Sequence, residues 1–344
     1  MMTSTLPTPS TAIRGVNLGG WLVLEKWMTP TLFDGTNAND EYSLMQTPGA
    51  KQKITHHRDT FITESDFAWI RDHGIQAVRI PIGYWIFDGD GPYIPAITYL
   101  DWVFNMAQQY SLNVIIDMHG LKGSQNGWDH SGHSGVSDWF KYTSYRNESI
   151  KTAERLVERY RDRDNFWGLQ IINEPKLGPV KIFKLLAFYK QAYKDIYAKL
   201  PEQTYFIVSD GYIPRIVMFL LPRSFRRLVL DVHIYHMTTP FAQYRSLDWF
   251  YKKTRRRARL ITYLSKKHPV IIGEWSGVLR SEITKNMNKA DETKATKYYT
   301  QLQIESFAPA LGWFYWNYKT EQPGTWNLRS IVDTKDVVWP FFEH

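Results

Sequence analysis

Eight short runs rich in Val, Ile and aromatic residues recur along the chain, and most gaps between them show the apolar spacing of helices. The runs span residues 13–20, 77–83, 113–120, 166–174, 204–210, 228–235, 269–275 and 311–317. Helices are expected within 64–73, 96–110, 148–163, 180–199, 247–267 and 287–307. Eight strand–helix units in 344 residues predict an α/β fold, a single (β/α)₈ TIM barrel with elaborated βα loops.

A doubly wound open sheet is the alternative architecture. Such a sheet more often carries a Gly-rich dinucleotide turn after its first strand, and Gly19-Gly20-Trp21 does not provide one. No Pro/Ser-rich linker or abrupt change of composition divides the chain. We therefore expect one domain over residues 1–344, with 1–12 as a flexible N-terminal tail.

The absence of cysteine and of long apolar segments excludes several kinds of site and bears on where the protein is located in the cell. The chain has no cysteine, which excludes disulfides, thiolate metal sites and a cysteine nucleophile. No apolar stretch approaches the roughly 18 residues that a membrane span requires, so no span is expected. The first ten residues have neither a positive start nor an apolar segment, which predicts a cytoplasmic protein by default. A secreted protein whose leader precedes this sequence would look the same.

The net charge of +8 raises the question of an acidic partner. Four arginines gather within 255–259 and three more within 223–227. The first group falls in an expected helix and the second just before an expected strand, and no nucleic-acid motif accompanies either. We therefore expect these arginines to lie on a solvated outer face, and we expect no nucleic-acid partner. Contact with an acidic surface is the remaining interpretation.

Two glutamates 100 residues apart end apolar runs, Glu174 in Ile-Ile-Asn-Glu-Pro and Glu274 in Ile-Ile-Gly-Glu-Trp. In a barrel, both carboxylates would emerge at the C-terminal ends of strands and face one pocket. Two facing carboxylates can cleave a glycosidic bond, one as acid and base and the other at the anomeric carbon. Glu174 is the expected acid/base, with a raised pKa, and Glu274 the expected nucleophile, kept ionised by its neighbours.

Further polar residues fall at the ends of the other expected strands. They are Arg79, His119, Asn173, His233 and Tyr235. A guanidinium and a phenol beside a carboxylate lower its pKa and fix its orientation. No histidine grouping is joined by carboxylates at helical spacing, so we expect no metal and no cofactor.

These motifs resemble glycoside hydrolase family 5, which carries Asn-Glu-Pro on strand 4 and a second Glu on strand 7. The resemblance implies a (β/α)₈ barrel, a retaining mechanism, and Glu174 and Glu274 as acid/base and nucleophile. It also implies active-site positions for Arg79, His119, Asn173, His233, Tyr235 and Trp316.

Within the family, residues 15–25, Gly-Val-Asn-Leu-Gly-Gly-Trp-Leu-Val-Leu-Glu, resemble the exo-β-1,3-glucanases of fungi. There the last Glu binds hydroxyls of the terminal sugar, which implies that role for Glu25. The segment around Asn126 is similar too, but Trp128 and His130 stand where those enzymes typically have Phe and Asn. An aromatic residue expected shortly after Tyr235 is also missing. These departures affect the leaving-group side of the site.

Aromatic residues in the expected mouth loops are candidates for stacking on sugar rings. They are Trp27, Trp128, Trp316 and Trp326.

The sequence therefore predicts a retaining β-glucosidase, exo-acting on β-1,3-glucan or gluco-oligosaccharides, with transglycosylation as a natural side reaction. Other β-glucosides, namely β-1,6-glucan, cello-oligosaccharides or a glucosylated lipid, are alternative substrates. A carbohydrate-binding barrel without activity is the alternative outside enzymes, although Arg79, Glu174 and Glu274 are all present. A monomer is expected.

Overall fold

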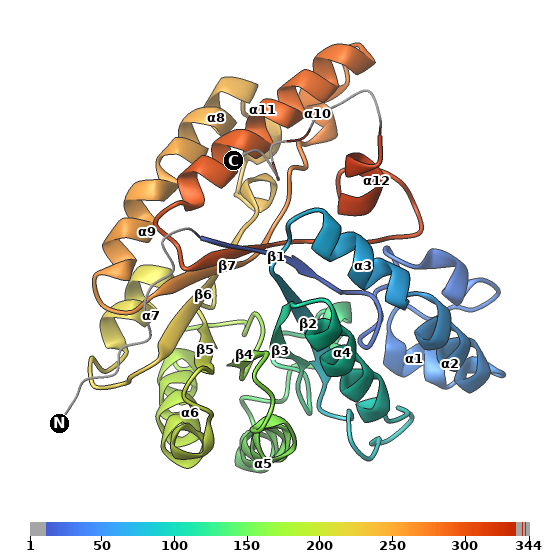
Figure 1. Cartoon of the computed structure of the whole chain (residues 1–344), viewed down its shortest axis with the longest axis vertical. Coiled ribbons are helices and arrows are strands. Elements are labelled where there is room, and N and C mark those ends of the chain that lie inside the picture. Colours follow the sequence, from blue (N-terminus) through green and yellow to red (C-terminus); the bar gives the residue numbers. More distant parts are fainter. Residues whose placement is uncertain (1–11, 335–338, 340, 342–344) are drawn as a thin grey trace.

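Eight parallel strands close into a barrel in the order of the sequence, and helices surround it (Figure 1). The computed structural model describes residues 12–334, 339 and 341, so the tail expected at 1–12 lies almost entirely outside the described residues. The strands are β1 (Ile13–Asn17), β2 (Ala77–Gly83), β3 (Asn113–Gly120), β4 (Phe166–Gln170), β5 (Tyr205–Ser209), β6 (Leu228–Ile234), β7 (Val270–Trp275) and β8 (Gly312–Tyr315). The (β/α)₈ prediction is confirmed, and the open-sheet alternative is wrong.

The barrel closes between the two ends of the chain. β1 pairs with β2, Gly15 facing Ala77, and also with β8, Ile13 facing Gly312. Gly15 is required here because a Cβ atom would lie 2.3 Å from the ring of Phe314, which packs against this part of β1. The Asn17 side chain strengthens the closure by donating to the carbonyls of Gly273, Phe314 and Tyr315.

The six expected helices are present, with shifted ends. They are α3 (Glu64–Asp72), α4 (Ile97–Gln109), α5 (Thr143–Tyr160), α6 (Lys181–Ile196), α8 (Leu247–Arg255) with α9 (Arg257–Ser265), and α11 (Lys289–Phe307). One helix was expected over 247–267, but the structure interrupts it at Arg256. Each helix packs apolar residues against the barrel, as Leu185, Tyr189 and Ala192 of α6 do.

Other helices lie in segments for which no helix was predicted. They are α1 (Glu41–Met45), α2 (Ala50–Thr60), α7 (Pro214–Leu220), α10 (Ser281–Thr284) and α12 (Leu328–Val332). α1 and α2 belong to the long segment between β1 and β2 (Figure 1). Among the described residues, no helix combines the length and the apolar character needed to cross a bilayer.

Candidate active site

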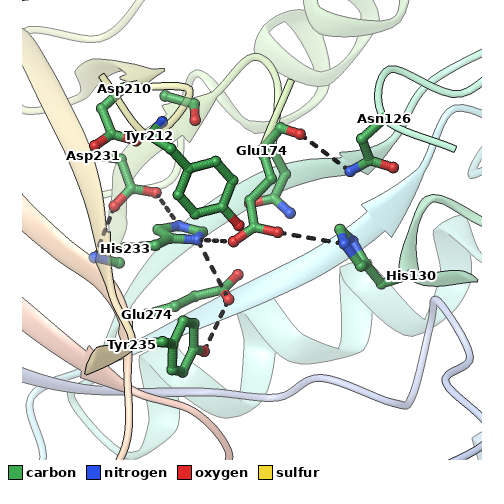
Figure 2. A network of polar contacts seen from close by, with 12 residues as sticks. Asn126, His130, Glu174, Asp210, Tyr212, Asp231, His233, Tyr235 and Glu274 are labelled. Carbon is green, nitrogen blue, oxygen red and sulfur yellow. Dashed lines mark hydrogen bonds and ion pairs between the residues drawn. The ribbon is translucent and has the colours of Figure 1, made fainter. Parts of the chain in front are cut away.

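The two glutamates meet at the C-terminal mouth of the barrel (Figure 2). Glu274 lies within β7, opposite His233 of β6. Glu174 lies four residues beyond β4, which ends at Gln170 rather than at 174 as predicted, and its φ of 43° is left-handed. Such a backbone is costly for a side chain with a Cβ and persists only where its surroundings enforce it. The nearest carboxylate oxygens of the two glutamates lie within 4.8 Å of each other.

Glu274 is held by donors from β2 and from the end of β6. Arg79 Nη1 donates to Oε1 at 3.1 Å, and the Tyr235 hydroxyl donates to Oε2 at 3.0 Å. Arg79 is fully buried; the same Nη1 also donates to the Asn17 side chain at 2.8 Å, and Nη2 donates to the Asn173 side chain at 3.0 Å. The guanidinium therefore fixes one side of Glu274.

Glu174 is held from three directions. His233 Nδ1 lies 2.6 Å from Oε1, and His130 Nε2 lies 3.3 Å from Oε2. The Asn126 amide donates to the backbone carbonyl of Glu174 at 3.1 Å. These contacts come from β6 and from the loop after β3, and they explain how the left-handed turn at Glu174 is maintained (Figure 2).

His233 lies between two carboxylates. Its Nε2 is 2.9 Å from Asp231, and its Nδ1 contacts Glu174, so both ring nitrogens donate and the ring is an imidazolium. Burial opposes this charge, but the surrounding carboxylates raise the pKa of His233 well above its usual value. Asp231 also accepts from the Gly273 amide at 2.7 Å, and a Cβ at Gly273 would lie 2.2 Å from it.

The pKa directions of the two glutamates are opposite to those expected from the sequence. Burial raises the pKa of Glu274 to about 7, although His233 and Arg79 oppose it. Burial also acts on Glu174, but the hydrogen bond and the charge of His233 outweigh it and lower the pKa of Glu174. The expectation failed because His233 places its charge nearer to Glu174, at 2.6 Å, than to Glu274, at 3.4 Å.

His119 forms the β3 side of the site. Its Nδ1 lies 2.6 Å from Asp117, and its Nε2 accepts from the Asn173 amide at 3.3 Å. Burial and the charge of Arg79 lower the pKa of His119 well below its usual value, so the ring is neutral. It stacks on Trp316 at 5.6 Å between ring centroids, which ties β3 to the end of β8.

A cavity of about 360 Å³ opens above these groups. This volume lies at the small end of the range of about 300–1,000 Å³ typical of ligand pockets. The residues that line it are Glu25, Trp27, His119, His130, Glu174, Tyr212, Tyr235, Met237, Thr238, Glu274, Trp316 and Trp326.

Glu25 is nearly buried in the cavity wall, and its Oε2 accepts from the Trp27 indole at 2.8 Å. Burial, with the charge of Asp129, raises the pKa of Glu25 well above its usual value. The Trp27 ring packs edge-on against Trp326 at 5.3 Å. Segments that follow β1 and β8 therefore form one wall of the cavity together.

Some predicted site residues support the cavity without lining it. Arg79 and Asn173 lie behind the glutamates, Asn126 holds the backbone of Glu174, and His233 lies beneath both carboxylates. Trp128 is at the rim, 38% exposed, with its ring 5.4 Å from that of His130. The remaining predicted residues all face the cavity.

Several residues of the site were not predicted. Asp117 and Asp231 each precede a predicted histidine by two positions. Because side chains alternate between the two faces of a strand, each Asp lies on the same face as its histidine, and this spacing could have identified both. Tyr212 lines the cavity and bonds Glu174, which contributes to the low pKa of that carboxyl. It lies in the loop after β5, and no motif marks it.

Donor atoms of Glu174, His233 and Glu274 lie within 4.8 Å of one another, a spacing that could hold a metal ion. Both nitrogens of His233 already donate to carboxylates, and a ligating nitrogen must be free of its proton. This donor set therefore fits a hydrogen-bonded cluster better than a metal site.

Comparison with known proteins places the chain among enzymes that act on glycans. The family model for cellulases (glycosyl hydrolase family 5) matches residues 36–322. A probable glucan 1,3-beta-glucosidase A of Aspergillus niger is 33% identical, covering 96% of this chain and 88% of the relative. A glucan 1,3-beta-glucosidase of Kluyveromyces lactis is 30% identical, with 94% and 87% covered.

Solved structures share the fold at lower identity. The rutinosidase from Aspergillus niger superposes with a TM-score of 0.83 at 21% identity, over 99% of this chain and all of that one. The endoglucanase Cel5A from Thermotoga maritima gives a TM-score of 0.60 at 17% identity, with 95% and 94% covered. Both are barrels of the same topology class as the one described above.

Proposed function

This chain belongs to glycosyl hydrolase family 5, and from that premise we propose that it releases glucose from the non-reducing end of β-1,3-glucan. The observation that carries the proposal is Glu25, a buried carboxylate in the wall of the small cavity that also holds Glu174 and Glu274. A carboxylate accepts two hydroxyl hydrogen bonds, which suits the end of a sugar chain. The names of the curated relatives support the β-1,3 linkage.

The separation of the glutamates supports retention of configuration. Their nearest oxygens lie no more than 4.8 Å apart, which is short of the roughly 6.5–9.5 Å between the carboxyl groups of inverting enzymes and fits the closer pair of retaining ones. Glu274 attacks the anomeric carbon and forms the glycosyl-enzyme. Glu174 protonates the leaving oxygen and then activates the water, or the acceptor sugar, that resolves the intermediate.

The proton for the first step resides on His233 in the substrate-free enzyme. Its Nδ1 is 2.6 Å from Glu174, so the proton can pass along this hydrogen bond as the leaving oxygen approaches. Asp231, at 2.9 Å on the other side, then holds the neutral ring. Arg79 and Tyr235 orient Glu274 throughout.

A second candidate is a β-glucoside with an apolar leaving group. Met237 and Thr238 line the cavity just after Tyr235, where the sequence lacks the expected aromatic clamp for a second sugar. Tyr212 lines the same cavity and is about half exposed. Met237 and the Tyr212 ring therefore give this side of the mouth an apolar surface, without the aromatic residue expected after Tyr235.

Product analysis distinguishes the two candidates. Purified enzyme is incubated with β-1,3-gluco-oligosaccharides, with β-1,6- and β-1,4-linked oligomers and with alkyl β-glucosides, beside Glu274→Gln as a blank. Glucose as the sole early product from the β-1,3 series supports the first candidate. Release from alkyl glucosides alone would replace it with the second, and shortened oligosaccharides without glucose would reject exo action.

A further inference from the structure

Helix α7 is apolar on its outer face as well as on its inner face. Val217 and Met218 are buried against the barrel, while Ile216, Phe219 and Leu220 are 51%, 77% and 37% exposed. Helices that are apolar on all sides are normally covered on all sides. Large exposed apolar groups on a helix of this kind mark an interaction surface.

The exposed apolar surface continues onto the start of α6. Val180 and Phe183 are 68% and 69% exposed. The segments that lead into the two helices touch, because Gly211 packs against Leu177 so closely that a Cβ would lie 2.5 Å from it. We call Val180, Phe183, Ile216, Phe219 and Leu220 the apolar face. α6 and α7 occupy neighbouring sides of the barrel (Figure 1).

The two segments that carry the apolar face are basic. Residues 176–194 contain five lysines and no Asp or Glu, and residues 211–230 contain four arginines and no Asp or Glu. Several of these cations contact neutral groups. Lys184 donates to the Phe140 carbonyl, and the Arg215 guanidinium lies over the Tyr263 ring. The partner of this surface must therefore combine apolar and anionic character.

We propose that the apolar face and its cations dock the enzyme onto an anionic lipid surface. A second copy of the chain would bring like charges together, and a neutral glucan would leave the cations without partners. Three of its five residues, Val180, Ile216 and Leu220, are aliphatic and offer no ring face for a sugar, unlike Phe183 and Phe219. A bilayer suits both features, since apolar side chains enter the acyl boundary while lysines and arginines reach the anionic headgroups.

Docking through this face would bring the cavity near the bilayer. Tyr212 lines the cavity and precedes α7 by two residues. The seven residues of α7 extend about 10 Å at 1.5 Å per residue. The inference concerns the surface alone and does not depend on which glucoside is cleaved.

Vesicle co-sedimentation of the full chain tests the proposal. Wild-type protein is expected to sediment with vesicles of phosphatidylcholine containing phosphatidylserine, much less with phosphatidylcholine alone, and less at high salt. Ile216→Ser with Phe219→Ser should reduce binding at least tenfold, and Lys181→Glu with Arg223→Glu at least about fivefold per cation lost. Hydrolysis of a soluble glucoside should not change in these variants, because none of the four residues lines the cavity.

Control variants lie on α11, away from α6 and α7 (Figure 1). Tyr298→Ser removes a 40% exposed ring, and Lys289→Glu reverses an exposed cation. Both should bind vesicles as the wild type does. The proposal is overturned if wild-type protein does not sediment with anionic vesicles, if the α11 variants lose as much binding as the α7 variants, or if Phe219→Ser converts a stable dimer to a monomer in light scattering.

Discussion

At the residue scale, Glu174 combines a left-handed backbone with contacts to His233 and His130. If it is the acid/base, Glu174→Ala should slow hydrolysis of glucosides with poor leaving groups by about 10²–10⁴-fold. The first step on aryl glucosides with good leaving groups should be spared, because they need no proton. Azide should then yield a β-glycosyl azide, detected by mass spectrometry. Equal losses on both substrate types, without the azide product, would remove Glu174 from this role.

A role of Glu25 in sugar binding can be separated from a role in folding stability. Glu25→Ala should lose at least about 10²-fold in kcat/KM on glucosides, since two hydrogen bonds to a charged group contribute about 1.5–3 kcal/mol each. Its melting temperature should not fall, because a carboxylate whose pKa burial raises does not favour the folded state when ionised. Trp27→Phe keeps the carboxylate and removes the indole donor at 2.8 Å, so it should lose less activity. Activity retained in Glu25→Ala would reject the role.

The sequence predicted the arginine, the histidines and the glutamates at the strand ends, but it did not predict Asp117 and Asp231, which hold the two histidines. Arg79, His233 and Glu274 are fixed by strand register, which the apolar runs define. The distribution of charge between Glu174 and Glu274 depends on distances of 2.6 and 3.4 Å from His233, which no spacing in the sequence encodes. The position of Tyr212 in the cavity wall depends on the path of the loop after β5, which the sequence does not reveal.

At the scale of elements, all eight strands were found because buried strands of a parallel sheet are nearly continuous apolar runs. α7 was missed for the same reason: Ile-Val-Met-Phe-Leu shows no helical period. α2 was missed because it is mostly polar: Ala50 and Ile54 are its buried apolar residues, too few to show a helical period. The break between α8 and α9 falls at Arg256, in a run of cations that gives no stop signal.

α2 is attached to the first βα turn by His57, whose Nε2 donates to the Gly20 carbonyl at 2.8 Å. Burial lowers the pKa of His57 to about 4, below its usual 6.5. The unfolded chain therefore takes up this proton first, so stability is fully present above pH 6.5 and is lost as the pH falls toward 4.

His57→Gln keeps an amide donor and removes the titration. Its free energy of unfolding in urea should change less between pH 7 and pH 4.5 than that of the wild type, by on the order of 2 kcal/mol. His56→Gln, at the exposed neighbouring position, is the matched control. An unchanged pH dependence in His57→Gln would show that His57 does not couple α2 to pH.

At the scale of the whole molecule, Asp66 joins α3 to the segment after β8. Its carboxylate accepts from Tyr318 at 2.8 Å and from Lys319 at 3.2 Å, and it pairs with Arg329. Burial opposes the charge, but Lys319 and the hydrogen bonds lower the pKa of Asp66.

Asp66→Asn should lower the free energy of unfolding by about 2–3 kcal/mol, because it leaves a nearly buried group facing two cations. kcat should be unchanged, since Asp66 does not line the cavity. Asp72→Asn removes an exposed pair with Arg71 and should cost less than about 1 kcal/mol. Urea unfolding monitored by tryptophan fluorescence measures both, and similar losses in the two variants would contradict a special role for Asp66.

Because β1 pairs with β8, the barrel also sets an order of events during synthesis. Asn17 is translated well before the three residues whose carbonyls accept from its side chain, which are Gly273, Phe314 and Tyr315. A nascent chain that stops before residue 311 exposes the unpaired edges of β1 and β7, and such edges recruit other chains. The barrel, and with it the complete active site, can therefore close only after β8 has been translated.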